Sequence, residues 1–160
     1  MTRVLFVCTG NVFRSLTAEY ALKHHMVGQS RIHVSSAGTR DAPEVRVRDD
    51  VAAYLLGKGL DVSNHRRTLV TNELLERTDL VVAMNTDHQK TLHERHGLGV
   101  PLYMEACGKG AVPLLDVDDL FAPGEWYTPA AIDHIQQIID QIIAASPALS
   151  ARLIADHQDR

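Results

Sequence analysis

Short apolar runs alternate with helix-like segments along the chain. Four apolar runs have the length and composition of strands, at residues 3–8, 31–38, 79–84 and 100–104. Segments with apolar residues at helical spacing lie between them, at residues 15–26, 46–59, 71–78 and 86–97. Strands that alternate with helices are typically parallel and joined by right-handed crossovers. The pattern therefore predicts an α/β fold with a parallel sheet.

A longer helical pattern follows at residues 129–145. Its isoleucines fall on one stripe, as in a helix that packs along a sheet: Ile132, Ile135, Ile138, Ile139, Ile142 and Ile143. Proline lacks a backbone N–H, so Pro147 is expected to interrupt this helix and to leave residues 146–160 as a short terminal helix or a frayed end. Residues 105–129 fit no regular element, and long connections of this kind are often functional.

Composition limits the class of protein. The 160 residues are 45% hydrophobic and 22% charged, which fits one globular domain over residues 1–160 with 146–160 as a possible extension. A net charge of −4 gives no general basic surface for nucleic acid. The first apolar run is too short for a signal peptide and no segment approaches a membrane span, so we expect a cytoplasmic protein with reduced cysteines.

Cys8 lies where the first strand is expected to end. Ligands of open parallel sheets bind beyond the carboxyl ends of the strands. Gly10 allows a tight turn, and residues 9–15 then enter a helix, so that successive backbone N–H groups can converge on one anion. Arg14 can close this ring with a planar set of donors suited to phosphate oxygens. No Lys-Ser or Lys-Thr pair follows Gly10, so a nucleoside triphosphate is not the expected ligand.

This setting also favours an ionised thiol. A free cysteine is mostly protonated at neutral pH, and a helix N-terminus stabilises an anion by only about 1 kcal/mol. Arg14, the loop N–H groups and the Ser15 hydroxyl add enough to stabilise a thiolate. A thiolate inside an anion-binding loop is a nucleophile directed at phosphorus.

The stretch FVCTGNVFRS, residues 6–15, places Cys-x5-Arg-Ser directly after an apolar strand and resembles the low-molecular-weight protein tyrosine phosphatases. Four further stretches agree: SSAGT (35–39), NHRRTL (64–69), DLVVAM (79–84) and DVDDLF (116–121). The resemblance runs from about Arg3 to Ala145. It implies a three-layer α/β/α sandwich with a four-stranded parallel sheet, the phosphatase I-like fold, and hydrolysis of a phosphomonoester with no metal or cofactor.

The resemblance implies a role for single residues as well. Cys8 is the nucleophile, Arg14 binds the phosphoryl group, and Ser15 donates a hydrogen bond to the thiolate. Asn11 holds the loop in shape, and Ser36 and His65 brace Asn11 and the loop. The phosphate-binding loop as a whole comprises Cys8, Thr9, Gly10, Asn11, Val12, Phe13, Arg14 and Ser15.

A carboxyl must protonate the leaving group and then activate water. The family places this acid in an Asp-Pro-aromatic motif, and the nearest match is Asp119 with Leu120 and Phe121. The proline is missing, so Asp116 and Asp118 stay open beside Asp119 as the expected acid.

Aromatic residues give two open interpretations. Phe121, Trp126 and Tyr127 can either line the cleft beside an aromatic substrate or pack against the protein. Residues 39–45 lack the aromatic that the family usually has in its substrate-selecting loop, which leaves substrate preference open. Phe13 stands where the family often has a second cysteine, so oxidation of Cys8 is expected to lack a protective disulfide.

The sequence thus predicts hydrolysis of protein phosphotyrosine through a phosphocysteine intermediate. A phosphoarginine phosphatase is an alternative, although Val12 offers no hydroxyl. An arsenate reductase of the same fold needs two further cysteines, and Cys107, which we interpret as structural or as an incidental surface thiol, is the only other one. A phosphate-binding module without turnover is the non-enzymatic alternative.

We expect the partner to be a phosphotyrosine protein or a small phosphomonoester. No nucleic acid, membrane or metal is expected, and the chain is expected to be a monomer or a weak homodimer. The arginines of residues 46–48 and 65–67 are expected to be solvent contacts, although they could favour acidic phosphopeptides.

Overall fold

A computed structural model describes residues 1–159 and contains a parallel sheet at its centre. The sheet has the strand order β2-β1-β3, with β1 at Thr2–Cys8, β2 at Ile32–Gly38 and β3 at Leu80–Ala83. In the register of the sheet, Cys8 lies opposite Gly38. The carboxyl ends of the strands therefore meet at one edge, where the sequence predicted the site.

The fourth strand, predicted at residues 100–104, is wrong as a full strand. In the part of the chain that the structure describes, it consists of one bridge between Ala83 and Leu102, and the helix α5 (Tyr103–Ala106) follows at once. Pro101 accepts a hydrogen bond from Ala83 but has no N–H to extend the ladder. Glu105 then accepts the N–H of Leu102 at 3.0 Å, which starts the helix.

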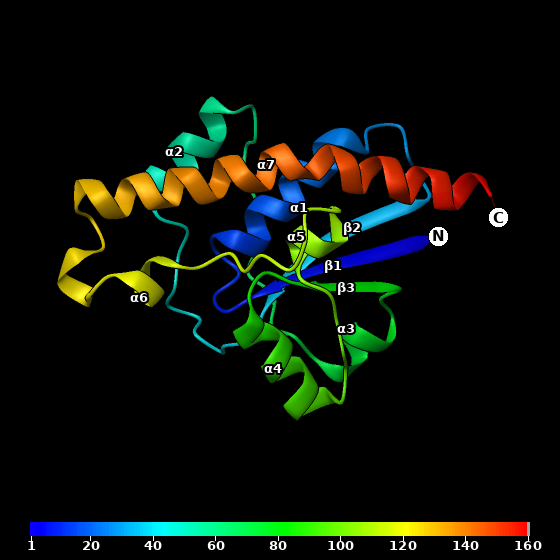
Figure 1. Cartoon of the computed structure of the whole chain (residues 1–160), viewed down its shortest axis with the longest axis horizontal. Coiled ribbons are helices and arrows are strands. Elements are labelled where there is room, and N and C mark those ends of the chain that lie inside the picture. The colour runs from blue at the N-terminus through cyan, green and yellow to red at the C-terminus, as the bar shows by residue number, and fades with distance from the viewer. Residues whose placement is uncertain (160) are drawn as a thin grey trace.

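Helices cover both faces of the sheet, as Figure 1 shows. The helices α1 (Arg14–His25), α2 (Asp49–Gly57) and α7 (Pro129–Gln158) lie on one side, and α3 (Asn72–Glu76) and α4 (Thr86–His96) lie on the other. Alternate residues of β1 pack against the helices on the two faces of the sheet, because successive side chains of a strand point to opposite faces. Val4 and Phe6 belong to the larger core cluster, and Leu5 and Val7 to the smaller one. The predicted α/β/α sandwich is confirmed.

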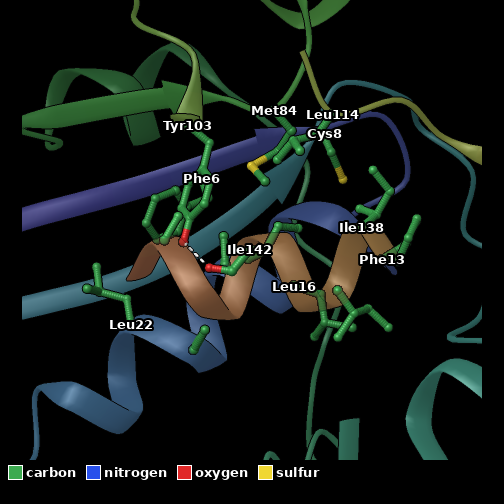
Figure 2. Packing of buried hydrophobic residues seen from close by; sticks show 14 of the residues in the cluster. Phe6, Cys8, Phe13, Leu16, Leu22, Met84, Tyr103, Leu114, Ile138 and Ile142 are labelled. Atoms are coloured by element: carbon green, nitrogen blue, oxygen red, sulfur yellow. Dashed lines mark hydrogen bonds between the residues drawn. The ribbon is translucent and has the colours of Figure 1, made fainter. Parts of the chain in front are cut away.

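The helix α7 continues through Pro147, and the predicted interruption there is wrong. It spans 30 residues, Pro129–Gln158, so residues 146–158 belong to the helix. Ile142 and Leu149 are fully buried on the two sides of the proline. The hydroxyl of Tyr103 donates to the carbonyl oxygen of Ile142 at 2.8 Å in the turn before Pro147 (Figure 2). Apolar burial on both sides outweighs the roughly 3 kcal/mol that an interior proline costs a helix.

By length and hydropathy alone, α7 could cross a membrane, contrary to the expectation that no segment approaches a span. The continuity through Pro147 produces this length. In the structure its buried side chains pack in the same core cluster as Leu16 and Leu22 of α1, which is the arrangement of a core helix.

The segment predicted to be irregular, residues 105–129, contains two short helices after α5. These are α6 (Val117–Leu120) and the 3-10 helix η1 (Pro123–Glu125). Leu114 and Val117 are buried and attach this segment to the core, so that it extends over the carboxyl edge of the sheet.

Candidate active site

The loop of residues 8–15 folds around the sulfur of Cys8. Cys8 is the last residue of β1 and is buried, and α1 begins at Arg14. Asn11 has a positive φ of 57°, a left-handed conformation that asparagine tolerates better than most residues. This turn directs the backbone N–H of Asn11 toward Cys8 Sγ, at 3.3 Å.

Two side chains order the hydroxyl that faces the sulfur. Ser15 Oγ lies 2.9 Å from Cys8 Sγ, and Asn11 Nδ2 donates to Ser15 Oγ at 3.0 Å. Because Ser15 Oγ already accepts from Asn11, its own proton is free to point at the sulfur. The Asn11 N–H and the Ser15 hydroxyl therefore both point hydrogen-bond donors at the sulfur.

Behind this pair lies a buried polar chain that ends at a carboxylate. Asn11 Nδ2 also donates to Ser36 Oγ at 2.8 Å, and Ser36 Oγ donates to Glu19 Oε2. Glu19 is 7% exposed and pairs with Lys23 Nζ at 2.5 Å. The side chains of Asn11, Ser36 and Glu19 are thus linked by hydrogen bonds, which fixes the orientation of the Asn11 amide.

Residues 65–68 hold the backbone of the loop from the other side. His65 Nε2 lies 2.8 Å from the carbonyl oxygen of Asn11, and Asn11 Oδ1 accepts the N–H of Thr68 at 2.9 Å. Arg67 Nε donates to the carbonyl of Gly10 at 2.7 Å, and its two terminal nitrogens donate to the carbonyls of Arg40 and Ala42. The loop is therefore preorganised by side chains from outside the loop itself.

Gly38 allows β2 to approach the loop closely. A Cβ at this position would lie 2.6 Å from the carbonyl oxygen of Thr9 and 3.2 Å from the backbone nitrogen of Asn11. Both atoms belong to the backbone and cannot rotate away. Only glycine fits here without moving the phosphate-binding loop.

Arg14 brings a positive charge to the base of the site. Its side chain is 3% exposed, Nη1 donates to the carbonyl of Leu114 at 2.9 Å, and Nη2 pairs with Asp116 Oδ2 at 3.2 Å. Within residues 1–159, the buried Nε of Arg14 has no hydrogen-bond partner. A buried donor without a partner is costly, so this N–H is available for an anion in the loop.

A cavity of about 110 Å³ lies over Cys8, and the three candidate carboxylates are placed differently around it. Asp116 and Asp118 line the cavity together with Gly10 of the loop. Asp119, which the sequence favoured as the acid, instead accepts the backbone N–H of Asp116 at 2.7 Å, as part of the cap of α6. The structure thus brings Asp118 to the cavity and holds Asp119 at the helix start.

The environment of Asp118 favours its protonated form. Burial is the main cause that raises the pKa of Asp118, and the carboxylates of Asp116 and Asp119 raise it further. The guanidinium groups of Arg14 and Arg40 lower it in part. A carboxyl with a raised pKa keeps its proton to higher pH, as a general acid needs.

His88 supports the loop from the first turn of α4. Its Nε2 lies 2.9 Å from Thr9 Oγ1, and its Nδ1 accepts the N–H of Asn85 at 3.1 Å. Burial, and secondarily the charge of Arg14, lower the pKa of His88 to about 3. The imidazole is therefore neutral near pH 7 and donates its Nε2 proton to the hydroxyl of Thr9.

The aromatic residues of the segment before α7 pack against the protein. Phe121 and Trp126 are partly buried against the main core cluster, and Tyr127 lies under the guanidinium of Arg48 at 3.9 Å. Arg48 also donates to the carbonyl of Trp126 at 2.8 Å. Packing is thus the interpretation observed for Phe121 and Trp126, whereas Tyr127 is 68% exposed, and none of the three lines the cavity over Cys8.

Cys107 lies away from the loop and is buried beside Tyr103, at 3% exposure. Burial raises the pKa of Cys107 to about 11, so its thiol stays protonated. The structure agrees with a structural cysteine and not with a surface thiol.

Three residues of the site were missed by the sequence reasoning. Glu19 lies four residues after Ser15 on the same face of α1, and this spacing was the available signal. Arg67 was interpreted as a solvent contact, and nothing in its sequence neighbourhood points to three backbone carbonyls. His88 carries a signal only in being polar and one turn into a helix, which many surface residues share.

The fold and the site together define a phosphatase that uses a cysteine nucleophile. The profile of the low molecular weight phosphotyrosine protein phosphatase family matches residues 3–158. The chain belongs to this family.

Relatives and a solved structure agree with this assignment. A probable low-molecular-weight protein-tyrosine-phosphatase EpsP of Ralstonia solanacearum is 26% identical over 91% of this chain and 97% of its own length. The protein-arginine-phosphatase of Bacillus subtilis is 33% identical over 59% of this chain and 63% of its own length. A structure of the YwlE arginine phosphatase with a phosphorylated active-site serine has a TM-score of 0.81 at 25% identity and covers 98% of this chain and 99% of that one.

Proposed function

We propose that the chain hydrolyses protein phosphotyrosine through a phosphocysteine intermediate at Cys8. The observation that carries this proposal is the Arg14 guanidinium, buried at the base of the loop, with an Nε that has no partner within residues 1–159. Arg14 ends the same loop whose Asn11 N–H and Ser15 hydroxyl contact the sulfur. Together these donors match a nucleophile and a dianion in one site.

In the first step, Cys8 Sγ attacks phosphorus and forms an S–P bond while the bond from phosphorus to the leaving oxygen breaks. The leaving oxygen takes the proton of the Asp118 carboxyl. Arg14 and the loop N–H groups bind the three equatorial oxygens, where negative charge is held in the transition state.

In the second step, the Asp118 carboxylate accepts a proton from water, and the water oxygen attacks phosphorus. The S–P bond breaks, inorganic phosphate leaves and the Cys8 thiolate is restored. We assign the acid to Asp118 and not to Asp119 because Asp118 lines the cavity over Cys8 and has the raised pKa.

Apolar side chains beside the cavity support an aromatic ester as the substrate. Val12, Phe13 and Val45 line the space over Cys8. The tyrosine-phosphatase relative also matches over 97% of its own length. Val12 carries no hydroxyl that could hydrogen-bond a guanidinium.

Phosphoarginine is the second candidate substrate. It is favoured by the likeness to the protein-arginine-phosphatase of Bacillus subtilis and to the YwlE structure. The same two steps apply, with a P–N bond breaking in place of a P–O bond.

A kinetic panel tests the proposal. Values of kcat/KM are measured for phosphotyrosine, phosphoserine and phosphoarginine peptides, and arsenate reduction is assayed alongside. Phosphotyrosine is expected to be fastest and to be lost in Cys8→Ser. Faster phosphoarginine hydrolysis would replace the substrate but keep the mechanism, and absence of any turnover would favour the non-catalytic binding module.

A further inference from the structure

We propose that a cavity beside the phosphate-binding loop binds an acidic side chain of the substrate protein, so that phosphorylated residues flanked by Asp or Glu are preferred. This inference rests on the proposed function, because it assigns a substrate class to the same site. The occupant is an acidic peptide segment next to the phosphorylated residue.

The cavity has a volume of about 580 Å³, within the usual size range of binding pockets. It lies between residues 43–47, the helix α2 and residues 62–67. Its apolar lining includes Val47, Ala52 and Val62. Such a surface suits the carbon atoms of a peptide chain.

The cavity adjoins the active site through shared side chains. Val12 of the loop and Val45 line both this cavity and the small cavity over Cys8. A peptide whose phosphate lies in the loop can therefore place a neighbouring residue in the larger cavity without crossing another element.

All the charged side chains that line the cavity, apart from the titratable His65, are positive. Arg46, Arg66 and Arg67 line it, and no aspartate or glutamate does. Arg67 is committed to the carbonyls of the loop region, whereas Arg46 has one bond, to the carbonyl of Pro43 at 2.9 Å.

Arg66 is exposed and forms no ion pair or side-chain hydrogen bond with any of residues 1–159, and Arg46 forms no ion pair with them either. The chain has a net charge of −4, so two arginines without carboxylate partners beside the active site are a local exception. Such charges select and steer an acidic partner.

The test measures the binding of two phosphotyrosine peptides to the Cys8→Ser protein by fluorescence anisotropy at low salt. The peptides are identical except that glutamates flank the phosphotyrosine in one and glutamines in the other. The acidic peptide is expected to bind about threefold to tenfold more tightly, the range that two exposed ion pairs provide, and salt is expected to reduce this ratio.

The variant Arg66→Gln is expected to reduce the ratio of affinities, and Arg66→Glu to reverse it. The side chain of Arg66 makes no bond that folding needs, so both variants are expected to fold. Arg31→Gln is the matched control, since it removes one exposed arginine just before β2, at the opposite end of the strand from Gly38. It is expected to leave the ratio unchanged.

Equal affinity for the two peptides, or a ratio that Arg66→Glu does not change, would overturn the inference. Turnover of p-nitrophenyl phosphate by the unaltered protein is measured separately, because this small ester has no acidic side chain that Arg46 or Arg66 could bind. Turnover without peptide preference would reject the acidic subsite alone, whereas no turnover would reject the proposed function whatever the peptides do.

Discussion

Asp118 and Asp119 are adjacent carboxylates in different surroundings, and this difference decides which of them can act as the general acid. Asp118 lines the cavity over Cys8, and Asp119 caps α6. Asp118→Asn is expected to lower kcat by about 10²- to 10⁴-fold with phenyl phosphate, the usual contribution of a general acid. The loss is expected to be smaller with p-nitrophenyl phosphate, whose leaving group needs little protonation.

The control for this prediction is Asp119→Asn, which removes the charge at the cap of α6, keeps an oxygen that can accept the N–H of Asp116, and leaves the Asp118 acid in place. The pH profile separates the two further. Activity is expected to fall as pH rises through the raised pKa of Asp118, since the acid must be protonated, and Asp118→Asn removes this limb. A larger loss in Asp119→Asn than in Asp118→Asn would reassign the acid to Asp119.

His88 links the loop to the pH dependence of stability. Its pKa of about 3 in the folded protein lies below the ordinary histidine value of 6.5, so below pH 6.5 the unfolded chain binds a proton that the folded chain does not. The free energy of unfolding is therefore complete above pH 6.5 and is expected to fall by up to about 1.4 kcal/mol per pH unit toward pH 3.

Chemical denaturation of the unaltered protein and of His88→Gln between pH 7 and 4 checks this. The free energy of unfolding is expected to fall more steeply with decreasing pH in the unaltered protein. The difference in slope corresponds to the uptake of about one more proton on unfolding. Parallel curves for the two proteins would show that His88 takes up its proton in the folded state as easily as in the unfolded chain.

At the scale of single elements, the close approach of β2 to the loop is the most constrained contact. In Gly38→Ala the new Cβ would overlap the carbonyl oxygen of Thr9, so the loop or the strand must move. The expected result is a loss of about 1 to 3 kcal/mol in the free energy of unfolding and a large loss of activity. Gly57→Ala, at the end of α2 with no atom within 4 Å of the new Cβ, is the matched control.

Thermal unfolding and turnover of both variants check this prediction. Gly57→Ala is expected to keep the stability and the activity of the unaltered protein. Gly59 is unsuitable as a control because its φ is positive, so that an added side chain would strain the backbone there. A fully active and stable Gly38→Ala would contradict the role of Gly38 as the position that admits the loop.

The elements that periodicity predicted well are those whose pattern reflects their own packing. β1 shows five consecutive buried residues at positions 4–8, and the sequence pattern predicted a strand covered on both faces. The fourth strand failed because Pro101 ends its hydrogen bonding, and the break at Pro147 failed because buried residues on both sides hold α7 together.

The residues of the site likewise fall into those that the sequence could predict and those that it could not. The Cys8 to Ser15 loop is contiguous in sequence, so its spacing could be recognised directly. Glu19, Arg67 and His88 come from three different elements and meet the loop only in the folded chain. Asp118 and Asp119 could not be separated, since one residue of register in α6 decides which carboxylate faces the cavity.

At the scale of the whole molecule, α7 connects the carboxyl edge of the sheet to the far end of the domain. His134, in its second turn, lies with Nε2 2.9 Å from the carbonyl oxygen of Leu115 and so helps to position the acid segment. Leu149, beyond Pro147, is fully buried in the main core cluster. Residues 146–158 are therefore expected to contribute to the stability of the same domain.

Leu149→Ala tests this expectation. The buried truncation is expected to lower the free energy of unfolding by about 2 to 5 kcal/mol. The matched control is Leu56→Ala, at a leucine that is 61% exposed, with an expected change within about 0.5 kcal/mol. Equal small effects in both variants would mean that the end of α7 is dispensable for the fold.

The phosphocysteine at Cys8 distinguishes nucleophilic catalysis from phosphate binding alone, and it can be trapped during turnover. Protein turning over p-nitrophenyl phosphate is quenched in acid, and the tryptic peptide of residues 4–14 is analysed by mass spectrometry. The expected result is the added mass of one phosphoryl group on Cys8, which disappears when turnover ends and is absent from Cys8→Ala. Steady turnover with no phosphate on Cys8 at any time would contradict it.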